Sequence, residues 1–469
     1  MKKSHSIDMC NGSLADKILL FALPLMASSL LQLLFNAADV VVVGRFAGKE
    51  ALAAVGSNTS LINLMINLFV GLSVGTNVVV SRDLGAGRYD NVGRSVHTAM
   101  TLALASGVAM MIFGVVMVRQ LLEWMSSPTD VIDLATIYLR IYFLGMPANL
   151  TYNFGAAILR AQGDTQRPLY FLTLAGVVNV VLNLVFVIGF HLDVAGVALA
   201  TIISQYISAA LVVRCLMLEP GPLHLDLKQL GLDRRLVTQI LRVGLPAGFQ
   251  GVVFSLSNVV IQSSLNSFND PALVAGAAAA SNIEGFVYVT MNAFHQASIS
   301  FVGQNYGAAK CDRVDRVAWL CAAFAALFGL VFGNLAYLFG APLANIYAPG
   351  EADVIQQALT RMFYTACPYF LCGIMEVLAG VLRGLGSSVI PMLTSIAGAC
   401  LLRLVWVATA FPIYHTPACL YLSYPVSWLL TALFHLFFLM VFVRRRAYAK
   451  VESNGPAYLA TEGHHPEQA

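Results

Sequence analysis

The sequence predicts an all-α membrane protein of 12 transmembrane helices, built as two pseudo-symmetric six-helix halves. Three observations predict it: the length of the apolar runs, the distribution of basic residues and an internal repeat. Of the 469 residues, 58% are hydrophobic and 11% are charged, whereas an ordinary soluble domain has about 25% charged residues. Apolar runs of about 20 residues can cross a bilayer, and they must be helical because unpaired peptide groups cannot face hydrocarbon. This composition argues against a soluble enzyme.

Charged residues, prolines and glycines separate the apolar runs. The spans lie near residues 15–43, 51–81, 94–118, 130–159, 168–190, 194–217, 236–264, 274–304, 316–340, 353–382, 390–412 and 419–443. The polar segment before the first span has no small-residue cleavage site after it. It is expected to be a cytoplasmic lead-in and not a signal peptide, so the first span counts as a helix.

Basic residues indicate the orientation of the spans. If the N-terminus is cytoplasmic, only Arg45, Lys49, Arg119, Arg140 and Arg361 of the 27 lysines and arginines fall outside, and Arg403 lies within a span. The other basic residues all fall on the cytoplasmic side, as the positive-inside rule requires. The sequence therefore predicts a multi-pass protein of the cell inner membrane with both termini in the cytoplasm.

An internal repeat relates the two halves. LPLMASSLLQLLFNAADVV from Leu23 is echoed by LPAGFQGVVFSLSNVVIQS from Leu245, and SRDLGAGRYDNVGR from Ser81 by GQNYGAAKCDRVDR from Gly303, both at an offset of 222 residues. The later turns RAQGDTQRP and RGLGSSVIP correspond as well. Six spans per half is an even number, so both halves enter the membrane in the same direction, and the substrate path is expected between them.

The repeat sets the expected domain limits. Residues 1–220 are the N-lobe with six spans, 221–235 a polar cytoplasmic linker, 236–446 the C-lobe, and 447–469 a cytoplasmic tail. The tail is polar and expected to be disordered, and His464 and His465 in it are interpreted as solvated. Eight cysteines without a CxxC pair are interpreted as packing residues. The net charge of +3 is too small to indicate nucleic-acid binding.

Ionisable side chains inside the spans are costly and therefore mark candidate functional sites. Asp39 in the first span is the clearest case, and Gln32, Asn36 and Asp39 follow one helical stripe at i, i+4 and i+7. The competing interpretation is that Asp39 only reaches water near Arg45. We favour the functional one and include Asn36 with Asp39 among the candidate residues of a cation site.

Neutral oxygens in two further spans could complete a cation site. Asn179 and Asn183 are spaced i, i+4 in the fifth span, and Thr201 lies in the sixth. A carboxylate with amide and hydroxyl oxygens suits Na⁺, whereas a desolvated Asp39 alone could bind a proton. Taken singly, each neutral residue is better explained by helix–helix hydrogen bonding, worth about 0.6–2 kcal/mol. Both ions remain open.

Further polar residues are expected to line a substrate cavity. Glu284 and His295 in the eighth span and Glu376 in the tenth align with Ile62, Ser73 and Asn153, so the repeat does not demand them. The remaining cavity candidates are Gln32, Asn258 and Gln262. Arg140 and Arg361 occupy matched positions, which indicates a structural or gating role. Pro24, Pro147, Pro246 and Pro368 are expected to interrupt helices and serve as hinges or plain kinks.

With these motifs the chain resembles the MATE (multidrug and toxic compound extrusion) family over nearly its full length, and within it the DinF-like bacterial branch. The resemblance implies two bundles of the MATE/MOP type and antiport of Na⁺ or H⁺ against organic, often cationic compounds. That branch uses a first-helix Asp, polar fifth-helix residues and a sixth-helix Thr, which Asp39, Asn179 and Thr201 match. Asn183 departs from the pattern, because an Asp is frequent at that place, and this weakens the case for sodium.

Two other features of the resemblance define the predicted function. The acids that the NorM-like branch carries on its seventh and tenth helices correspond here to Ser255 and Cys372, so a C-lobe cation site of that kind is doubtful, although Glu376 is one turn away. We predict a monomeric exporter of amphipathic organic compounds, driven by Na⁺ or H⁺ through alternating access and needing no cofactor. The alternative is a lipid or lipid-linked oligosaccharide flippase, for which the spans lack basic residues. Motifs of hydrolases and zinc proteases are missing from the sequence.

Overall fold

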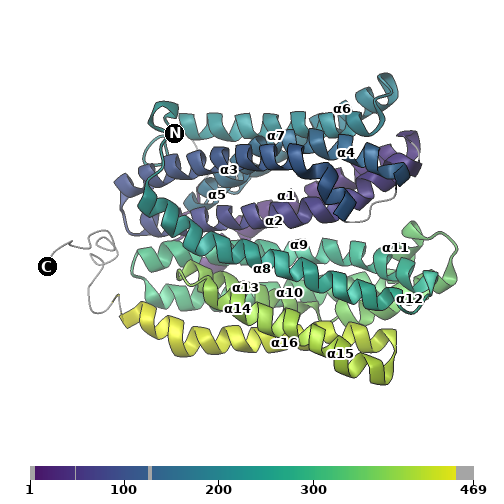
Figure 1. Ribbon diagram of the computed structural model, residues 1–469. Helices are drawn as coiled ribbons and strands as arrows, with labels where there is room; N and C mark the ends of the chain where they lie inside the picture. The colour runs from purple at the N-terminus through teal and green to yellow at the C-terminus, as the bar shows by residue number, and fades with distance from the viewer. Residues whose placement is uncertain (1–5, 48, 125–128, 450, 452–469) are drawn as a thin grey trace. The chain divides into compact units, whose positions relative to one another are not determined.

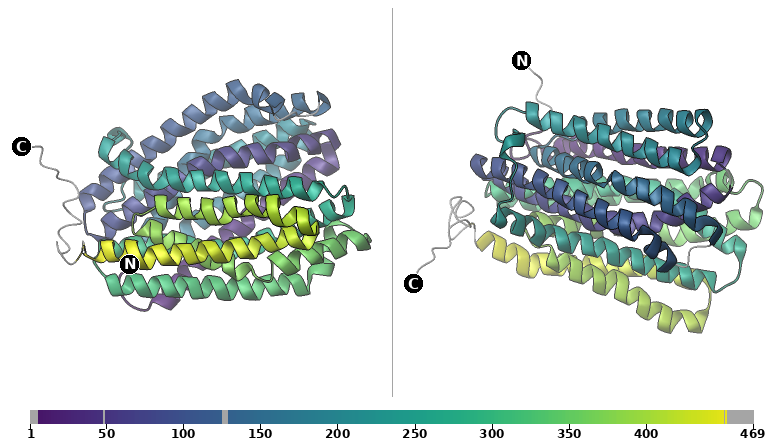
Figure 2. Two further views of the ribbon diagram at one scale, coloured as in Figure 1. Left: turned by 60° about the horizontal axis from the view of Figure 1, so that its bottom comes forward. Right: turned by 45° about the horizontal axis from the view of Figure 1, so that its top comes forward.

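The structure is a computed structural model that describes residues 6–47, 49–124, 129–449 and 451. This part of the chain is helical almost throughout and contains no β-strand (Figures 1 and 2). The α-helices are α1 (Leu14–Val42), α2 (Lys49–Gly85), α3 (Tyr89–Trp124), α4 (Thr129–Leu144), α5 (Met146–Gln162), α6 (Gln166–Leu184), α7 (Asp193–Leu218), α8 (Arg234–Asn266), α9 (Pro271–Gly307), α10 (Cys311–Leu338), α11 (Gly340–Tyr347), α12 (Ala352–Thr365), α13 (Tyr369–Gly384), α14 (Val389–Ser395), α15 (Leu402–Tyr414) and α16 (Pro417–Phe438). Short segments of other helix types are η1 (Val43–Ala47), η2 (Val185–Gly189), η3 (Leu227–Gln229), η4 (Ile396–Leu401) and η5 (Leu439–Val443).

The described helices supply 10 candidate membrane spans, or 12 when each bent helix pair counts as one span. Within the described ranges, 10 helical spans are long and apolar enough to cross a bilayer, and two more are helix pairs bent by 47°. The bent pairs are α4 with α5 and α12 with α13, which correspond to the predicted spans 130–159 and 353–382. The predicted fold class is therefore confirmed.

Prolines act differently at the four places where helix breaks were expected. Pro147 lies in the first turn of α5, directly after the bend, and Pro368 precedes α13 in the other bent pair. Pro24 and Pro246, by contrast, lie inside the continuous helices α1 and α8, so the expected interruption at these two positions is wrong. A helix can continue past a proline when only one backbone hydrogen bond is lost and neighbouring groups compensate for it.

The chain forms two compact units whose limits differ from the expected lobes. Unit 1 comprises Met1–Ile7, Ala27–Leu84 and Arg88–Gly248, and unit 2 comprises Asp8–Met26, Gly85–Gly87 and Phe249–Ala469. The first half of α1 thus belongs to unit 2, and the first half of α8 to unit 1. The two boundaries, after Met26 and after Gly248, are again 222 residues apart and lie two residues beyond Pro24 and Pro246.

Specific contacts explain why residues 8–26 belong to unit 2. The ring of Phe21 packs edge-on against Phe301 of α9, with 5.5 Å between the centroids. Asn305 donates its side-chain amide to the Met9 carbonyl at 3.1 Å, and Arg313 of α10 donates to the Gly12 carbonyl at 3.0 Å. These contacts fix the N-terminal segment on α9 and α10.

Unit 1 packs α3, α4, α5, α6 and α7 side by side, with α3 against α4 and α5, and α7 against α4, α5 and α6 (Figure 1). The first half of α8, which belongs to unit 1, packs closely on α2. A Cβ atom at Gly75 of α2 would lie only 2.3 Å from the carbonyl oxygen of Ile240 on α8. Glycine is required there so that the two backbones can approach. In unit 2, α9 contacts α10, α12 and α13, and α16 contacts α12, α13 and α15.

The predicted linker is more ordered than its composition suggests. Leu223 and Leu225 are buried in the core of unit 1, and the backbone N–H of Asp226 donates to Nε2 of His97 in α3 at 3.0 Å. The segment therefore packs on α3 and is part of unit 1. In the predicted tail, residues 452–469 with His464 and His465 lie outside the described residues.

Candidate ion and substrate sites

Asp39 lies in the last turn of α1, at the centre of a chain of polar side chains in unit 1. Asn183 of α6 donates its side-chain amide to Oδ1 of Asp39. The same amide also lies 3.3 Å from Oδ1 of Asn179, and the Asn179 amide lies 3.5 Å from Oγ1 of Thr201 on α7. Three helices thus bring together four of the five residues that the sequence predicts as a cation site, in the order Asp39, Asn183, Asn179 and Thr201. The fifth, Asn36, is exposed on α1 and is not part of this chain of contacts.

Local helix geometry places these groups inside the bundle. Asn179 and Asn183 are one helical turn apart and therefore share one face of α6, and both are buried. The π-helical segment η1 directly follows α1, and η2 follows α6 shortly after Asn183. Such segments with an extra residue per turn occur frequently at functional sites, since they redirect the side chains around them.

The site contains an acceptor without a partner. Oδ1 of Asn183 is buried and accepts no hydrogen bond. A buried polar atom without a partner is rare in folded proteins and calls for an explanation such as a bound ion. Together with the Asp39 carboxylate and the oxygens of Asn179 and Thr201, it forms an oxygen-rich environment of the kind that hard cations prefer.

Two tyrosines of α4 lie near Asp39. Tyr138 and Tyr142 of α4 are stacked, with 6.1 Å between the ring centroids, and are close enough to interact with Asp39 electrostatically. Arg45 is exposed in η1, and no ion pair of Asp39 occurs among the side chains that the structure describes. The alternative that Asp39 merely pairs near Arg45 thus lacks a contact. Gln32 and Asn36, the other members of the stripe on α1, are exposed.

In unit 2 the predicted cavity residues separate into different environments. Asn258 and Gln262 are exposed on α8, where Gln262 donates to Oδ1 of Asn266 at 3.2 Å. Glu284 of α9 is buried and forms an ion pair with Arg361 of α12, with 3.1 Å between Oε2 and Nη2. The three residues therefore do not form one site.

His295 and Glu376 belong to a second buried cluster. Nδ1 of His295 lies 2.6 Å from the backbone carbonyl of Glu376 and 3.8 Å from its carboxylate. Nη1 of Arg383 lies 3.1 Å from Nε2 of His295, and its Nη2 donates to Gln250 at 2.8 Å. Arg383 directly follows the predicted span 353–382, and the structure buries its side chain in α13. Its assignment to the cytoplasmic end of that span stays a prediction.

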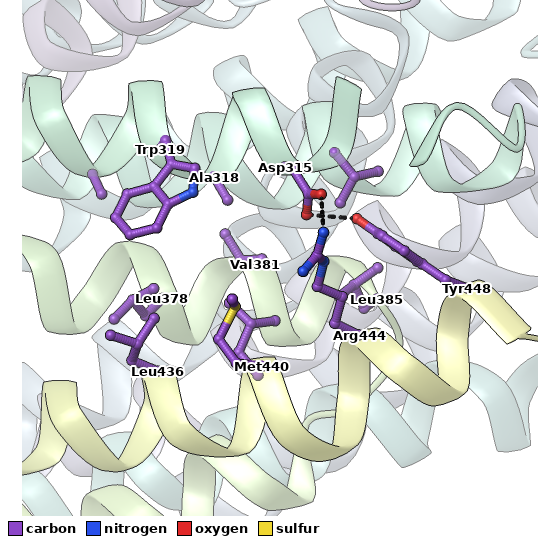
Figure 3. Close-up of a pocket in the computed structure, with 13 residues that line it drawn as sticks. Asp315, Ala318, Trp319, Leu378, Val381, Leu385, Leu436, Met440, Arg444 and Tyr448 are labelled. Carbon is purple, nitrogen blue, oxygen red and sulfur yellow. Dashed lines mark hydrogen bonds and ion pairs between the residues drawn. The ribbon is translucent and has the colours of Figure 1, made fainter. Parts of the chain in front are cut away.

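The structure also contains a pocket that the sequence does not indicate. A small apolar pocket, with a cavity volume of about 30 Å³, lies in unit 2 between α10, α13, α16 and η5 (Figure 3). At one end, Arg444 pairs with Asp315 at 2.6 Å, and the Tyr448 hydroxyl donates to Asp315 at 2.8 Å. The other lining residues are almost all apolar, and none of the predicted site residues belongs to the lining.

Comparisons with known proteins agree with this architecture. The MatE family model matches residues 24–185 and again residues 246–409, so the family's unit occurs twice, at the same 222-residue offset as the repeat. A probable multidrug resistance protein, YoeA of Bacillus subtilis, is 27% identical over 384 residues, which cover 80% of this chain and 82% of the relative. An FAD transporter of Shewanella oneidensis is 23% identical over 423 residues, covering 87% and 90%.

Solved structures show the same fold. A crystal structure of a MATE protein in complex with MaL6 superimposes with a TM-score of 0.87 at 22% identity, covering 96% of this chain and 99% of that one. The outward-facing structure of a multidrug resistance MATE transporter of the MOP superfamily gives the same values. The chain is a multi-pass membrane transporter and not an enzyme, and it belongs to the MatE family.

Proposed function

We propose that this transporter is an antiporter that exports amphipathic organic compounds in exchange for H⁺ or Na⁺, with Asp39 as the coupling residue. The observation that carries the proposal is the polar chain from Asp39 through Asn183 and Asn179 to Thr201, which includes a partly buried carboxylate without an ion-pair partner among the described residues. A carboxylate held in this way is costly inside a membrane, and a bound cation removes that cost.

Coupling follows from the charge of Asp39 in the two states. With a proton or sodium ion bound, the site is neutral and can pack inside unit 1. When the ion leaves, the carboxylate is charged again and favours a conformation with more water or a new partner. A cation that binds one conformation better than the other shifts the equilibrium between them, which is the requirement for exchange. Thr201 and Asn179 add oxygens to the site.

The names of the relatives support amphipathic organic compounds as the substrate class. Several are called multidrug resistance proteins, and one is called an FAD transporter. Amphipathic molecules with an aromatic body, including cations, are therefore the proposed cargo. A flippase of lipid-linked oligosaccharides is not favoured, because Arg403 is the one arginine near the middle of a predicted span.

The proposal is tested in proteoliposomes loaded with rhodamine 123, an amphipathic cation, under Na⁺ and pH gradients imposed separately. The wild type should release the dye under one gradient at least about tenfold faster than without a gradient. Asp39→Asn removes the charge with little change of volume and should abolish the gradient-driven part, because the cation loses its only formal negative charge.

Asp133→Asn is the matched control. Asp133 is also in unit 1, but its side chain is 75% exposed and pairs with Arg119 at the surface. This variant should transport at the wild-type rate, since exposed ion pairs contribute little to stability. Gradient-driven release that persists in a folded Asp39→Asn protein would refute Asp39 as the coupling residue.

A further inference from the structure

Arg403 is a buried guanidinium in unit 2 whose described partners are all neutral. It is 3% exposed. Its Nε donates to Oγ of Ser427 at 3.0 Å, its Nη1 donates to Oδ1 of Asn258 at 3.4 Å, and its Cζ lies 4.2 Å from the centroid of the Tyr424 ring. No hydrogen bond between described residues involves Nη2, so one donor group has no assigned acceptor.

The other buried charges of unit 2 do not compensate Arg403. Glu284 is paired with Arg361, and Glu376 lies in the cluster with His295 and Arg383. Arg403 has no ion-pair partner among the side chains that the structure describes. A buried charge without an opposite charge beside it strongly destabilises the folded protein. An arginine inside a membrane span that lacks such a partner is typical of a functional site.

The place of Arg403 in the fold gives a second, independent argument. Asp39, Asn179/Asn183 and Thr201 come from α1, α6 and α7 of the first repeat. Asn258, Arg403 and Ser427 come from α8, α15 and α16, which are the corresponding elements of the second repeat, as the matched LP motifs and the RAQGD and RGLGS turns show. The fold therefore builds the same three-helix polar cluster twice, once around a carboxylate and once around a guanidinium.

The guanidinium lies close to an exposed polar stripe. Asn258, Gln262 and Asn266 follow one another at i, i+4 and i+8 on α8, and all three are exposed. Asn258 contacts Arg403 directly. A row of amides on a membrane-spanning helix is poorly suited to lipid and typical of a cavity wall. A charged group of a ligand on this stripe would need to displace only the weak Asn258 contact to reach Arg403.

We propose that Arg403 binds a single anionic group of the transported compound, such as a carboxylate or a sulfonate. The inference rests on the proposed export function and names a substrate class for it, namely amphipathic compounds that carry one negative charge, zwitterions included. Guanidinium nitrogens bind planar oxyanions through paired hydrogen bonds. One guanidinium fits one such group, whereas a lipid-linked pyrophosphate headgroup would need several cations.

A matched pair of dyes tests the proposal. Rhodamine 123 is the methyl ester of rhodamine 110, so the two share the xanthene body and differ only in a free carboxylate. Binding is measured by fluorescence anisotropy on purified full-length protein in lipid nanodiscs, without any gradient. The wild type should bind rhodamine 110 more tightly than rhodamine 123. Arg403→Gln should weaken rhodamine 110 about tenfold, the usual effect of one charged hydrogen-bonding pair, and change rhodamine 123 less than about twofold.

Two controls separate charge recognition from folding. Arg316→Gln removes an exposed arginine of the same unit and should change neither affinity. Asn258→Asp keeps Arg403 and places a carboxylate at the position of an amide oxygen that already contacts it. This internal anion should occupy the guanidinium and weaken rhodamine 110 selectively, so it provides the test if Arg403→Gln does not fold.

The outcomes distinguish this inference from the proposed function. Equal loss of both dyes in Arg403→Gln and Asn258→Asp, or unchanged rhodamine 110 binding in either folded variant, would overturn the anion site. Arg403-dependent binding without gradient-driven export would leave the site intact and contradict antiport. Gradient-driven export of rhodamine 123 without selective binding of rhodamine 110 would support antiport and overturn the anion site.

Discussion

The ion pair of Glu284 and Arg361 explains an asymmetry between the two repeats. The arginine occurs in both halves as Arg140 and Arg361, but Arg140 is exposed, whereas Arg361 is largely buried. The residue that corresponds to Glu284 in the first half is Ile62, which supplies no charge. Glu284 therefore balances an arginine that unit 2 buries, and Thr365 donates a further hydrogen bond to it. This arrangement favours a structural role of Glu284 over substrate contact.

A double-mutant cycle tests that structural role. Arg361→Gln should lower the free energy of unfolding by roughly 3–5 kcal/mol, because it leaves Glu284 charged and buried without its partner. Glu284→Gln with Arg361→Gln together should cost clearly less than the sum of the single changes, since no unpaired charge remains. Thermal unfolding in detergent, followed by intrinsic fluorescence, measures all four proteins. Additive losses would show that the two side chains do not stabilise each other.

Among the helices, α8 shows how a polar residue outside the membrane fixes a helix start. Oδ1 of Asp233 accepts hydrogen bonds from the backbone N–H groups of Arg235 at 2.9 Å and Leu236 at 3.3 Å, and Arg94 of α3 also pairs with its carboxylate. Partial burial opposes the charged form, but these hydrogen bonds and Arg94 outweigh it and hold the pKa of Asp233 below its usual value. The cap and the Arg94 pair thus hold the end of the linker and the start of α8 on α3 within unit 1.

Substitutions at Asp233 separate the cap from the ion pair. Asp233→Ala should cost about 0.5–2 kcal/mol of stability near pH 7, the usual value of a helix N-cap. Asp233→Ser keeps an acceptor for the backbone and should recover most of this loss, because the Arg94 side chain is 62% exposed and exposed pairs contribute little.

The pH dependence of the same cap follows from its lowered pKa. A carboxylate with a folded pKa below the unfolded value of about 3.9 stabilises the protein fully above that value. The contribution is lost as the pH falls through the folded pKa. The melting-temperature difference between wild type and Asp233→Ala should therefore be constant from pH 5 to pH 8 and shrink below about pH 4. A difference that grows in acid would contradict the assignment.

For the whole molecule, patterns local in the sequence predicted more than contacts between distant residues. Span lengths depend on consecutive apolar residues, so all 12 spans were predicted, and the Asp39 cluster followed from helical spacing together with family resemblance. The pairing of Glu284 with Arg361, 77 positions apart, depends on how α9 packs on α12, which spacing does not encode. The same holds for Arg383, whose burial depends on His295 and Gln250 from other helices. Pro24 and Pro246 lie inside continuous helices, because a proline alone does not decide where a helix ends and neighbouring groups can compensate for the lost hydrogen bond.

The orientation of the whole chain remains a prediction that rests on the basic residues, and it is tested by chemical labelling. In a background where the eight cysteines are replaced by serine, single cysteines are introduced at Lys228 in η3 and at Glu351 before α12, both of which are exposed. Three predicted spans separate the two positions in the chain, so they are expected on opposite sides of the membrane. A membrane-impermeant maleimide added to intact cells should label Glu351→Cys at once. It should label Lys228→Cys only after the membrane is opened, since the loop with Lys228, Arg234 and Arg235 is expected to stay in the cytoplasm. Labelling of Lys228→Cys in intact cells would reverse the orientation. It would then place Asp39, at the end of α1, near the cytoplasmic side, so that ions would enter the site from the cytoplasm.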